Sequence, residues 1–436
     1  MPSLLNKLSQ QDTWQDYYVY KCEFAQLTRR EETELREFVE SQAWLPIVEK
    51  LLAPEGRLGV PEKRLINKLG KATKRVVYSF AVGEQQVLKV LAWLLYYYDD
   101  AQPPECYSFR RGYGAHKAIR RLTSLPNIDS LYCYKLDIQD YFNSIDVAKL
   151  LPILAEVFAD DKPLYSFFKG LLTADEAVLD GKVINEKRGA MAGTPTAPFL
   201  ANLYLREMDH VLATKAAAYA RYSDDIIIFA ESAERRDELR VLAREMLAGY
   251  GLKPNPAKEH CSAPGEVWEF LGFAYQQGVI DLSEATQRKL KGKISRKARA
   301  LRRWMKRKDA SPERTIAAMI RSMNRKFYGE DRKTGAQGAQ RQYAPGELTP
   351  QFSEQGSSHE LTWSRWFFPL INTSVSLARI DAYLQQELRT IATGRHSKTN
   401  YKLRYQSLKE LGYRSLVNEY YRFKKAREKR LPHSVY

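Results

Sequence analysis

The central part of the chain reads Tyr219-Ala220-Arg221-Tyr222-Ser223-Asp224-Asp225-Ile226-Ile227-Ile228-Phe229-Ala230. It places two adjacent carboxylates directly before a run of apolar, strand-forming residues. A Ser-Asp-Asp turn between two short strands would hold both acids at the tip of a β-hairpin, where their side chains can converge on metal ions. Burying a charge is costly unless it is paired or binds a metal. The pattern at Asp224 and Asp225 therefore favours metal ligands over a structural turn. The Asp-Asp pairs at 99–100 and 160–161 have a helix end and polar neighbours beside them and are interpreted as solvated loop or helix-terminus charges.

A second strand with a terminal carboxylate precedes this stretch. Residues 132–138 alternate as a strand does and carry Asp137 near their end, where it would reach the same sheet edge as Asp224. Asp140 and Asp146 follow in a turn into a helix, and we interpret them as charges at the start of that helix. Carboxylates on neighbouring strands can hold two divalent cations about 3.5–4 Å apart, which aligns an attacking hydroxyl with a leaving phosphate oxygen. The sequence therefore predicts nucleotidyl-transfer chemistry.

Composition narrows the choice of partner. The 436 residues are 44% hydrophobic, which is typical of folded protein, and the length allows two or more domains. The formal net charge of +17 favours a polyanionic partner, either nucleic acid or an anionic membrane surface. The longest apolar stretch, residues 87–98, is too short to span a bilayer, and no signal-peptide pattern is visible. Four cysteines without CxxC spacing predict a reducing compartment. We therefore expect a cytoplasmic nucleic-acid protein with no membrane partner.

Several basic or glycine-containing segments could bind phosphate. Residues 65–80 predict a basic hairpin, for which an ordinary exposed hairpin is an equally good interpretation. Arg110 and Arg111 stand next to two glycines that permit tight backbone near an anion. Residues 189–209 form a small-residue loop that leads into a helix, and the loop would let a nucleic-acid strand lie close to the backbone. Lys258 could reach a triphosphate, although a surface lysine is the common alternative.

The last third of the chain has a strongly basic start. Residues 285–308 contain no acid and repeat apolar residues at helical spacing, so we expect a helix with one packed face and one cationic face along a phosphate backbone. Residues from about 331 to 358 are rich in Gly, Gln, Ser and Pro and predict a flexible insertion. From Trp363 onward, aromatic residues alternate with basic ones. They can stack on single-stranded bases or form the core of a small helical domain, and the pattern leaves both open.

Taken in order, these motifs resemble those of reverse transcriptases, most closely the bacterial enzymes related to group II intron, retron and phage-defence reverse transcriptases. The resemblance covers roughly residues 60–305. Residues 135–145 look like the first catalytic motif of the family, and Tyr222-Ser223-Asp224-Asp225 looks like its signature box. Residues 193–205 resemble the motif that contacts template and primer, Lys258 matches the palm lysine, and residues 270–272 resemble the primer-grip turn.

The resemblance implies an α+β right-hand polymerase fold of fingers, palm and thumb with a helical C-terminal extension. The expected division is 1–50 as an N-terminal helical extension, 51–130 as fingers, 131–281 as palm with inserted fingers elements, 282–330 as a basic helical thumb, 331–360 as a flexible insertion and 361–436 as a helical C-terminal region.

The resemblance also implies roles for individual residues. Asp137 and Asp224 would bind two Mg²⁺ ions (or Mn²⁺), with help from Asp225 and the Ile138 carbonyl, and Lys258 would protonate the leaving pyrophosphate. Phe142 falls where a bulky ring blocks a ribose 2′-OH. The dNTP-binding set would be Lys71, Lys74, Arg75, Phe142 and Gly193. The nucleic-acid-binding set would be Arg110, Arg111, Asn202, Phe270, Leu271, Gly272, Lys291, Lys293, Arg296, Arg299 and Arg303.

One departure from the family pattern concerns template handling. The family carries Pro-Gln before the glycine of the middle motif, and this chain has Met191-Ala192 before Gly193. A glutamine that would contact the template–nucleotide pair is therefore missing, which puts ordinary template handling or fidelity in question and leaves the metal chemistry untouched.

The resulting hypothesis is an RNA-directed DNA polymerase that copies an RNA template, such as a dedicated non-coding RNA, from a DNA primer and dNTPs in bacterial antiviral defence. A partner protein or a homo-oligomer also fits. Three alternatives stay open at this point: a template-independent or protein-primed DNA polymerase, a mobile-element (retron or intron-type) reverse transcriptase, and a non-enzymatic RNA-binding scaffold.

Overall fold

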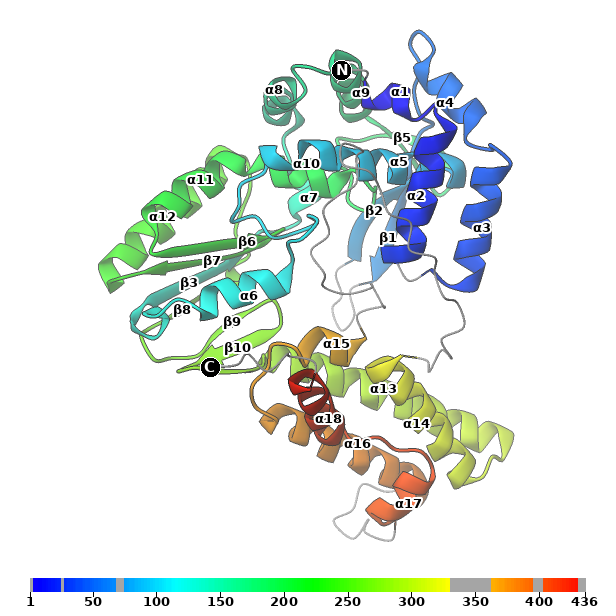
Figure 1. Cartoon of the computed structure of the whole chain (residues 1–436), viewed down its shortest axis with the longest axis vertical. Helices are drawn as coiled ribbons and strands as arrows, with labels where there is room; N and C mark the ends of the chain where they lie inside the picture. The colour runs from blue at the N-terminus through cyan, green and yellow to red at the C-terminus, as the bar shows by residue number, and fades with distance from the viewer. Residues whose placement is uncertain (1–2, 25–26, 68–73, 330–361, 395–402, 430–436) are drawn as a thin grey trace. The chain divides into compact units, whose positions relative to one another are not determined.

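The computed structural model describes residues 3–24, 27–67, 74–329, 362–394 and 403–429. These fall into two compact units, residues 1–266 and 267–436 (Figure 1). The described part of the chain contains no helix that is long and apolar enough to cross a membrane. The predicted flexible insertion at 331–360 lies outside the described residues. The finer six-part division stays a prediction.

The first unit begins with a helical layer and a four-stranded sheet. The helices are α1 (Leu4–Lys7), α2 (Gln11–Phe24), α3 (Arg29–Glu40) and α4 (Leu45–Leu52). Trp14 of α2 is fully buried and stacks on Trp44 with ring centroids 5.0 Å apart. The sheet has the order β2-β1-β4-β5. Its strands and the helices that follow β2 are β1 (Glu62–Asn67), β2 (Lys74–Ser79), β4 (Glu176–Leu179), β5 (Lys182–Asn185), α5 (Val82–Leu94) and η1 (Leu95–Ala101).

The predicted basic hairpin is present as the antiparallel pair of β1 and β2, in which Asn67 is the partner of Lys74. Its connecting residues, which include Lys71, lie outside the described residues. Lys74 and Arg75 are exposed at the start of β2.

A second sheet of the first unit carries the Asp-Asp hairpin. Its order is β6-β7-β3-β8, all antiparallel. Residues 226–230 of β7 are almost completely buried because β7 is a central strand and α12 packs on both β7 and β3 (Figure 1). The strands are β3 (Tyr132–Asp137), β6 (Ala218–Tyr222), β7 (Asp225–Ala230) and β8 (His260–Ser262).

Most of the remaining helices of the first unit share one hydrophobic core with this sheet. That core is continuous from the N-terminal helices to Leu252. Asp146 caps α8 by accepting a hydrogen bond from the Ala148 amide at 3.0 Å, as its place before a helix predicted. The helices are α6 (Ala115–Thr123), η2 (Ile128–Ser130), α7 (Tyr141–Ser144), α8 (Val147–Val157), α9 (Lys162–Thr173), α10 (Ala197–Tyr204), α11 (Arg206–Lys215), α12 (Ala233–Gly249) and η3 (Pro256–Lys258).

The second unit consists of a small sheet and a helical bundle. The sheet has the order β11-β10-β9, and the predicted basic helix is confirmed as α13, whose Leu290, Ile294 and Ala298 are buried against α14 and α16. The elements are β9 (Trp268–Phe270), β10 (Phe273–Gln276), β11 (Val279–Leu282), α13 (Glu284–Lys308), α14 (Pro312–Tyr328), α15 (Trp363–Phe367), α16 (Val375–Thr393), α17 (Tyr405–Glu410) and α18 (Leu416–Glu428).

The aromatic residues of the C-terminal region mostly build this second unit. Phe367, Phe368, Tyr413 and Tyr420 are buried, whereas Tyr421 is exposed. Asp381 of α16 is buried and accepts hydrogen bonds from the Tyr413 hydroxyl and from the first amides of α18. The interpretation as a helical core therefore accounts for most of these side chains. Only the exposed rings among them are accessible for stacking on bases.

Candidate active site

The Asp-Asp motif forms a tight hairpin loop at the edge of the second sheet. Tyr222 and Asp225 are the last paired residues of β6 and β7, so Ser223 and Asp224 form the loop between them. Ser223 has a φ of 60°, the left-handed conformation that a two-residue hairpin loop requires at its first position. The loop therefore turns the chain sharply and leaves Asp224 at its tip.

Strand β3 brings a third carboxylate to the same place. In the register of β3 and β7, Asp137 is the direct partner of Asp225. The Ile138 amide donates a hydrogen bond of 2.9 Å to the Asp224 carbonyl and extends this pairing into the loop. Partners across an antiparallel pair have Cβ atoms about 4.5–5.5 Å apart. The alternation of β3 and the turn at Ser223 thus place Asp137, Asp224 and Asp225 at one sheet edge.

Burial and the charge of neighbouring carboxylates raise the pKa values of Asp224 and Asp225. Burial, with the nearby Asp137 as the next cause, raises the pKa of Asp224 to about 6. Burial also raises the pKa of Asp225, against the opposing charge of Lys135, whose Nζ lies 3.6 Å from Asp225 Oδ1. Like charges held together out of water each disfavour the ionised form of the other. A positive charge placed at this sheet edge would therefore be strongly stabilised.

Two lysines and a side-chain amide stabilise part of the negative charge of these carboxylates. Lys258 forms an ion pair with Asp137, and the Asn255 side-chain amide donates to Asp137 Oδ1 at 3.4 Å. The Lys258 side chain is about half exposed (48%), whereas that of Asp137 is 6% exposed. Within the described ranges, no group of three or more His, Cys, Asp or Glu side chains is already arranged as a metal site. The available donors are carboxylate oxygens, which suit a hard divalent cation.

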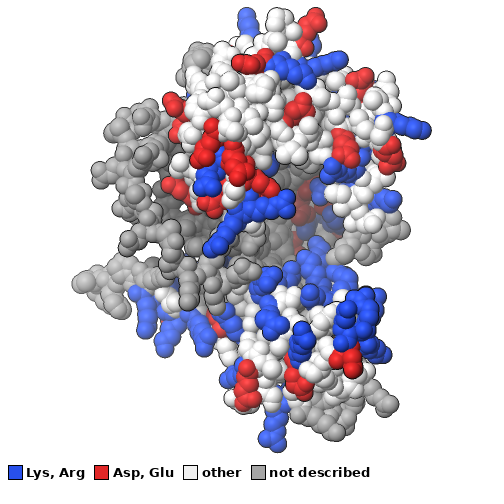
Figure 2. Space-filling model, turned by 90° about the vertical axis from the view of Figure 1, so that its right-hand side faces the viewer, with Lys and Arg blue, Asp and Glu red and all other residues white. Residues whose placement is uncertain are grey.

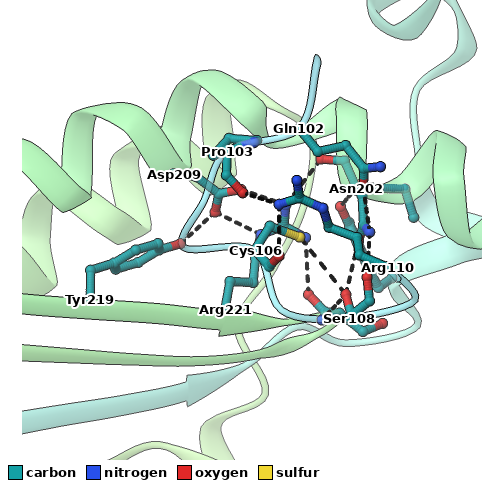
Figure 3. A network of polar contacts seen from close by, with 12 residues as sticks. Gln102, Pro103, Cys106, Ser108, Arg110, Asn202, Asp209, Tyr219 and Arg221 are labelled. Carbon is teal, nitrogen blue, oxygen red and sulfur yellow. Dashed lines mark hydrogen bonds and ion pairs between the residues drawn. The ribbon is translucent and has the colours of Figure 1, made fainter. Parts of the chain in front are cut away.

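A buried polar network, drawn in Figure 3, is hydrogen-bonded to the loop. The Ser108 hydroxyl accepts a hydrogen bond of 2.9 Å from the Ser223 amide and donates one of 2.9 Å to Asn202 Oδ1. The Asn202 side-chain amide in turn donates to Gln102 Oε1 and to the Ser108 carbonyl, both at 2.7 Å. All of these hydrogen bonds are buried. The network therefore fixes the backbone of the loop that carries Asp224.

An ion pair with no solvent exposure adjoins this network. The Arg221 and Asp209 side chains are both 0% exposed and form two hydrogen bonds of 2.7 and 2.5 Å. Asp209 also accepts a hydrogen bond of 2.6 Å from the Tyr219 hydroxyl. Arg221 further donates to the Asn202 carbonyl at 3.0 Å and reaches the Ser223 carbonyl at 3.5 Å (Figure 3). Sequence reasoning missed this pair, and an arginine inside an apolar strand pattern is the signal that could have revealed it.

The loop beside the first sheet is tied to strand β2. The Tyr78 amide donates to the Ala192 carbonyl at 2.7 Å, and the Ala192 amide donates to Asn143 Oδ1 at 3.0 Å. Gly193 has a φ of 101°, and a Cβ there would lie 2.9 Å from the Tyr78 carbonyl oxygen. The departure at Met191-Ala192 therefore occurs in a buried segment that backbone bonds and a close approach hold in place.

The predicted nucleic-acid contacts of the first unit lie in different surroundings from those expected. Arg110 is 8% exposed and forms a forked ion pair with Asp99, and Tyr113 lies against its guanidinium. Arg111 packs on aromatic rings, and burial lowers its pKa. Asn202 is 1% exposed, with its amide engaged as described above. These placements give the three residues a role inside the protein, and direct contact with nucleic acid stays a prediction for each.

The predicted contacts of the second unit are mainly on its surface. Leu271 and Gly272 form the turn between β9 and β10 with φ values of 51° and 90°, whereas Phe270 is fully buried. Lys291 is half-buried with its Nζ 5.7 Å from the centre of the Tyr383 ring. Figure 2 shows Lys and Arg side chains gathered over this unit. Exposed members of the predicted set on α13 are Lys293, Arg296, Arg299 and Arg303.

Comparison with known proteins gives a consistent match. Residues 66–275 match the family model described as "Reverse transcriptase (RNA-dependent DNA polymerase)". Retron Ec86 reverse transcriptase of Escherichia coli is 22% identical over 190 residues, covering 43% of this chain and 55% of that protein. Retron Mx65 reverse transcriptase of Myxococcus xanthus is 24% identical over 185 residues, covering 40% of this chain and 43% of that protein.

The chain thus spans about half the length of these curated relatives. Among solved structures, apo telomerase from Candida tropicalis, truncated from the C-terminal domain, aligns with a TM-score of 0.41 at 13% identity over 60% of this chain and 63% of that one.

Proposed function

Because residues 66–275 match the reverse transcriptase family model, we propose that the protein is an RNA-directed DNA polymerase. The observation that supports this most directly is the register that sets Asp137 opposite Asp225, with Asp224 in the adjoining loop. A partly buried, mutually repelling set of carboxylates suits divalent cations, and reverse transcriptases generally use them. Asp137, Asp224 and Asp225, with the Ile138 carbonyl, would hold two Mg²⁺ ions. These ions would polarise the attacking primer hydroxyl and offset charge on the leaving phosphate.

The other proposed roles belong to residues around the carboxylates. Lys258 is close enough to Asp137 to act at the same centre, where it would give a proton to the departing pyrophosphate. Lys74 and Arg75 are exposed cations on β2 that would bind the triphosphate, and Gly193 lies against Tyr78 of the same strand. The exposed cations of α13 would follow the phosphate backbone of the template and product without reading its sequence.

Phe142 is the proposed selector of the nucleotide sugar. Its ring is half-buried, and the helix that carries it, α7, starts four residues after Asp137. Phe142→Ala is expected to increase incorporation of ribonucleotides relative to deoxyribonucleotides by about tenfold or more, since the ring would no longer exclude a 2′-OH. The ratio of kcat/KM for matched rNTP and dNTP pairs measures this. Phe167→Ala, which removes a half-buried ring that packs on Phe168 in α9, is the matched control. An unchanged ratio for the Phe142 variant would remove it from this role.

The template is tested by sequencing the DNA made with co-purified RNA. If the proposal holds, the product is complementary to that RNA and is not formed when the RNA is digested with ribonuclease before dNTPs are added. The departure at Met191-Ala192 motivates a second candidate, a template-independent or protein-primed polymerase, for which the product would be a homopolymer or random and would still form after that digestion. We further propose that the RNA is a dedicated non-coding RNA, and that the enzyme acts in the cytoplasm in antiviral defence.

A further inference from the structure

Phe109 combines two unfavourable features. Its backbone has a φ of 58°, a left-handed conformation that is a clear outlier for a bulky side chain. The residue is also 46% exposed, although its neighbours Ser108 and Arg110 are buried. An exposed ring gains little from burial, so packing does not compensate for the backbone conformation. Such outliers concentrate at functional sites when the surrounding structure enforces them.

The surrounding structure does enforce this conformation. On one side, the Ser108 hydroxyl bridges the Ser223 amide and Asn202. On the other side, Arg110 is held by Asp99 and also donates to the Pro103 and Cys106 carbonyls at 2.6 and 3.2 Å. With both neighbours anchored in the interior, Phe109 has no freedom to relax, and its ring is held at the surface.

The ring of Phe109 lies next to the candidate active site. Its centroid is 6.4 Å from that of Phe142, edge to face at 74°, and 6.2 Å from that of Tyr222. Phe142 is the proposed sugar selector, and Tyr222 directly precedes the loop of Asp224. The three rings therefore form one aromatic cluster that borders the carboxylate edge, and Phe109 is its most exposed member.

We propose that Phe109 is a nucleoside-contacting residue of this active site. Its ring would pack against the apolar face of a base or sugar, either of the incoming nucleotide or of the terminal pair of the primer–template. Stacking of this kind tolerates any base, because every base has a π face. The inference rests on the proposed function. It supplies an apolar nucleotide contact in a chain that lacks the glutamine of the middle motif.

The test uses Phe109→Asn in the full chain, because asparagine tolerates the left-handed conformation and removes the ring. We expect an unfolding temperature equal to or above that of the wild type, together with an increase of about tenfold in KM for dNTPs or in Kd for a primer–template. A rise in KM assigns the contact to the incoming nucleotide, and a rise in Kd assigns it to the terminal pair. Phe109→Tyr keeps the ring and should remain close to wild type in both quantities.

Tyr97→Asn is the matched control, because Tyr97 is a 38% exposed aromatic of the same unit whose ring packs on Tyr98. If Phe109→Asn does not fold, Phe109→Gly replaces it, since glycine also accepts the conformation. Unchanged KM and Kd in a folded ring-less variant would overturn the inference, as would equal losses in the Tyr97 control. Kd is measured without catalysis, so a wild type that incorporates no dNTP would refute the proposed function while the binding comparison still reports on Phe109.

Discussion

Replacing both Asp224 and Asp225 by asparagine is expected to lower dNTP incorporation about 1,000-fold or more. Asparagine keeps the size of the side chain and removes the negative charge that a divalent cation requires. The stabilisation that metal ions give to the transition state of phosphoryl transfer amounts to several kcal/mol, and each 1.4 kcal/mol is a factor of ten in rate. The measurement is single-nucleotide extension of a labelled primer at saturating dNTP.

The same variant should remain folded and able to bind nucleic acid. Burial and Asp137 raise the pKa of Asp224 to about 6, so its ionised form destabilises the metal-free fold at neutral pH, and an uncharged asparagine relieves this cost. The unfolding temperature without metal should therefore be unchanged or higher. Asp180→Asn, an exposed loop residue between β4 and β5, controls for the substitution itself. Full residual synthesis by the double variant would contradict the assignment of the carboxylates.

Asp209→Leu is expected to lower the free energy of unfolding by about 3–5 kcal/mol, because it leaves the Arg221 guanidinium buried without its partner. Both side chains are 0% exposed, and Asp209 also accepts the hydrogen bond of the Tyr219 hydroxyl. Denaturant unfolding of the purified protein measures the change. Disruption of the exposed pair of Arg30 and Glu34 by Glu34→Leu is the control, since surface pairs contribute about 0–1 kcal/mol.

A double variant separates stability from positioning. Asp209→Leu with Arg221→Met removes both charges, and an apolar pair of similar volume should recover part of the lost stability. Activity should not recover to the same extent, because Arg221 also donates to the Asn202 carbonyl and reaches the Ser223 carbonyl beside Asp224. A double variant with wild-type stability and wild-type kcat would show that this network does not position the loop.

Much of the carboxylate edge was predictable because its signals are local. The strand pattern that ends at Asp137 can be recognised from a few consecutive residues, and so can the turn that carries Asp224 and Asp225. The structure places these three acids at one sheet edge, as the patterns indicated. The amphipathic pattern of residues 285–308 likewise gave α13, since helical spacing and charge are properties of the segment alone.

The hydrogen-bond network that holds the carboxylate edge in place was not predictable in the same way. Ser108 and Ser223 are 115 positions apart, and Ser108 and Asn202 are 94 apart, so no local pattern links them. The interpretation of Arg110 and Asn202 as contacts for nucleic acid followed from charge and motif, whereas in the structure both are buried among partners of the protein itself.

The sequence by itself determined which chemical groups the chain can bring to a site, because carboxylates, cations and strand periodicity depend only on residue type and spacing. Only the tertiary structure decided how that chemistry is held. Folding buries Arg221 against Asp209, ties the loop to Ser108, and fixes Phe109 in a left-handed conformation with its ring beside Phe142. The physical reason is that burial and hydrogen bonding between distant segments depend on how the elements pack, which residue spacing does not specify.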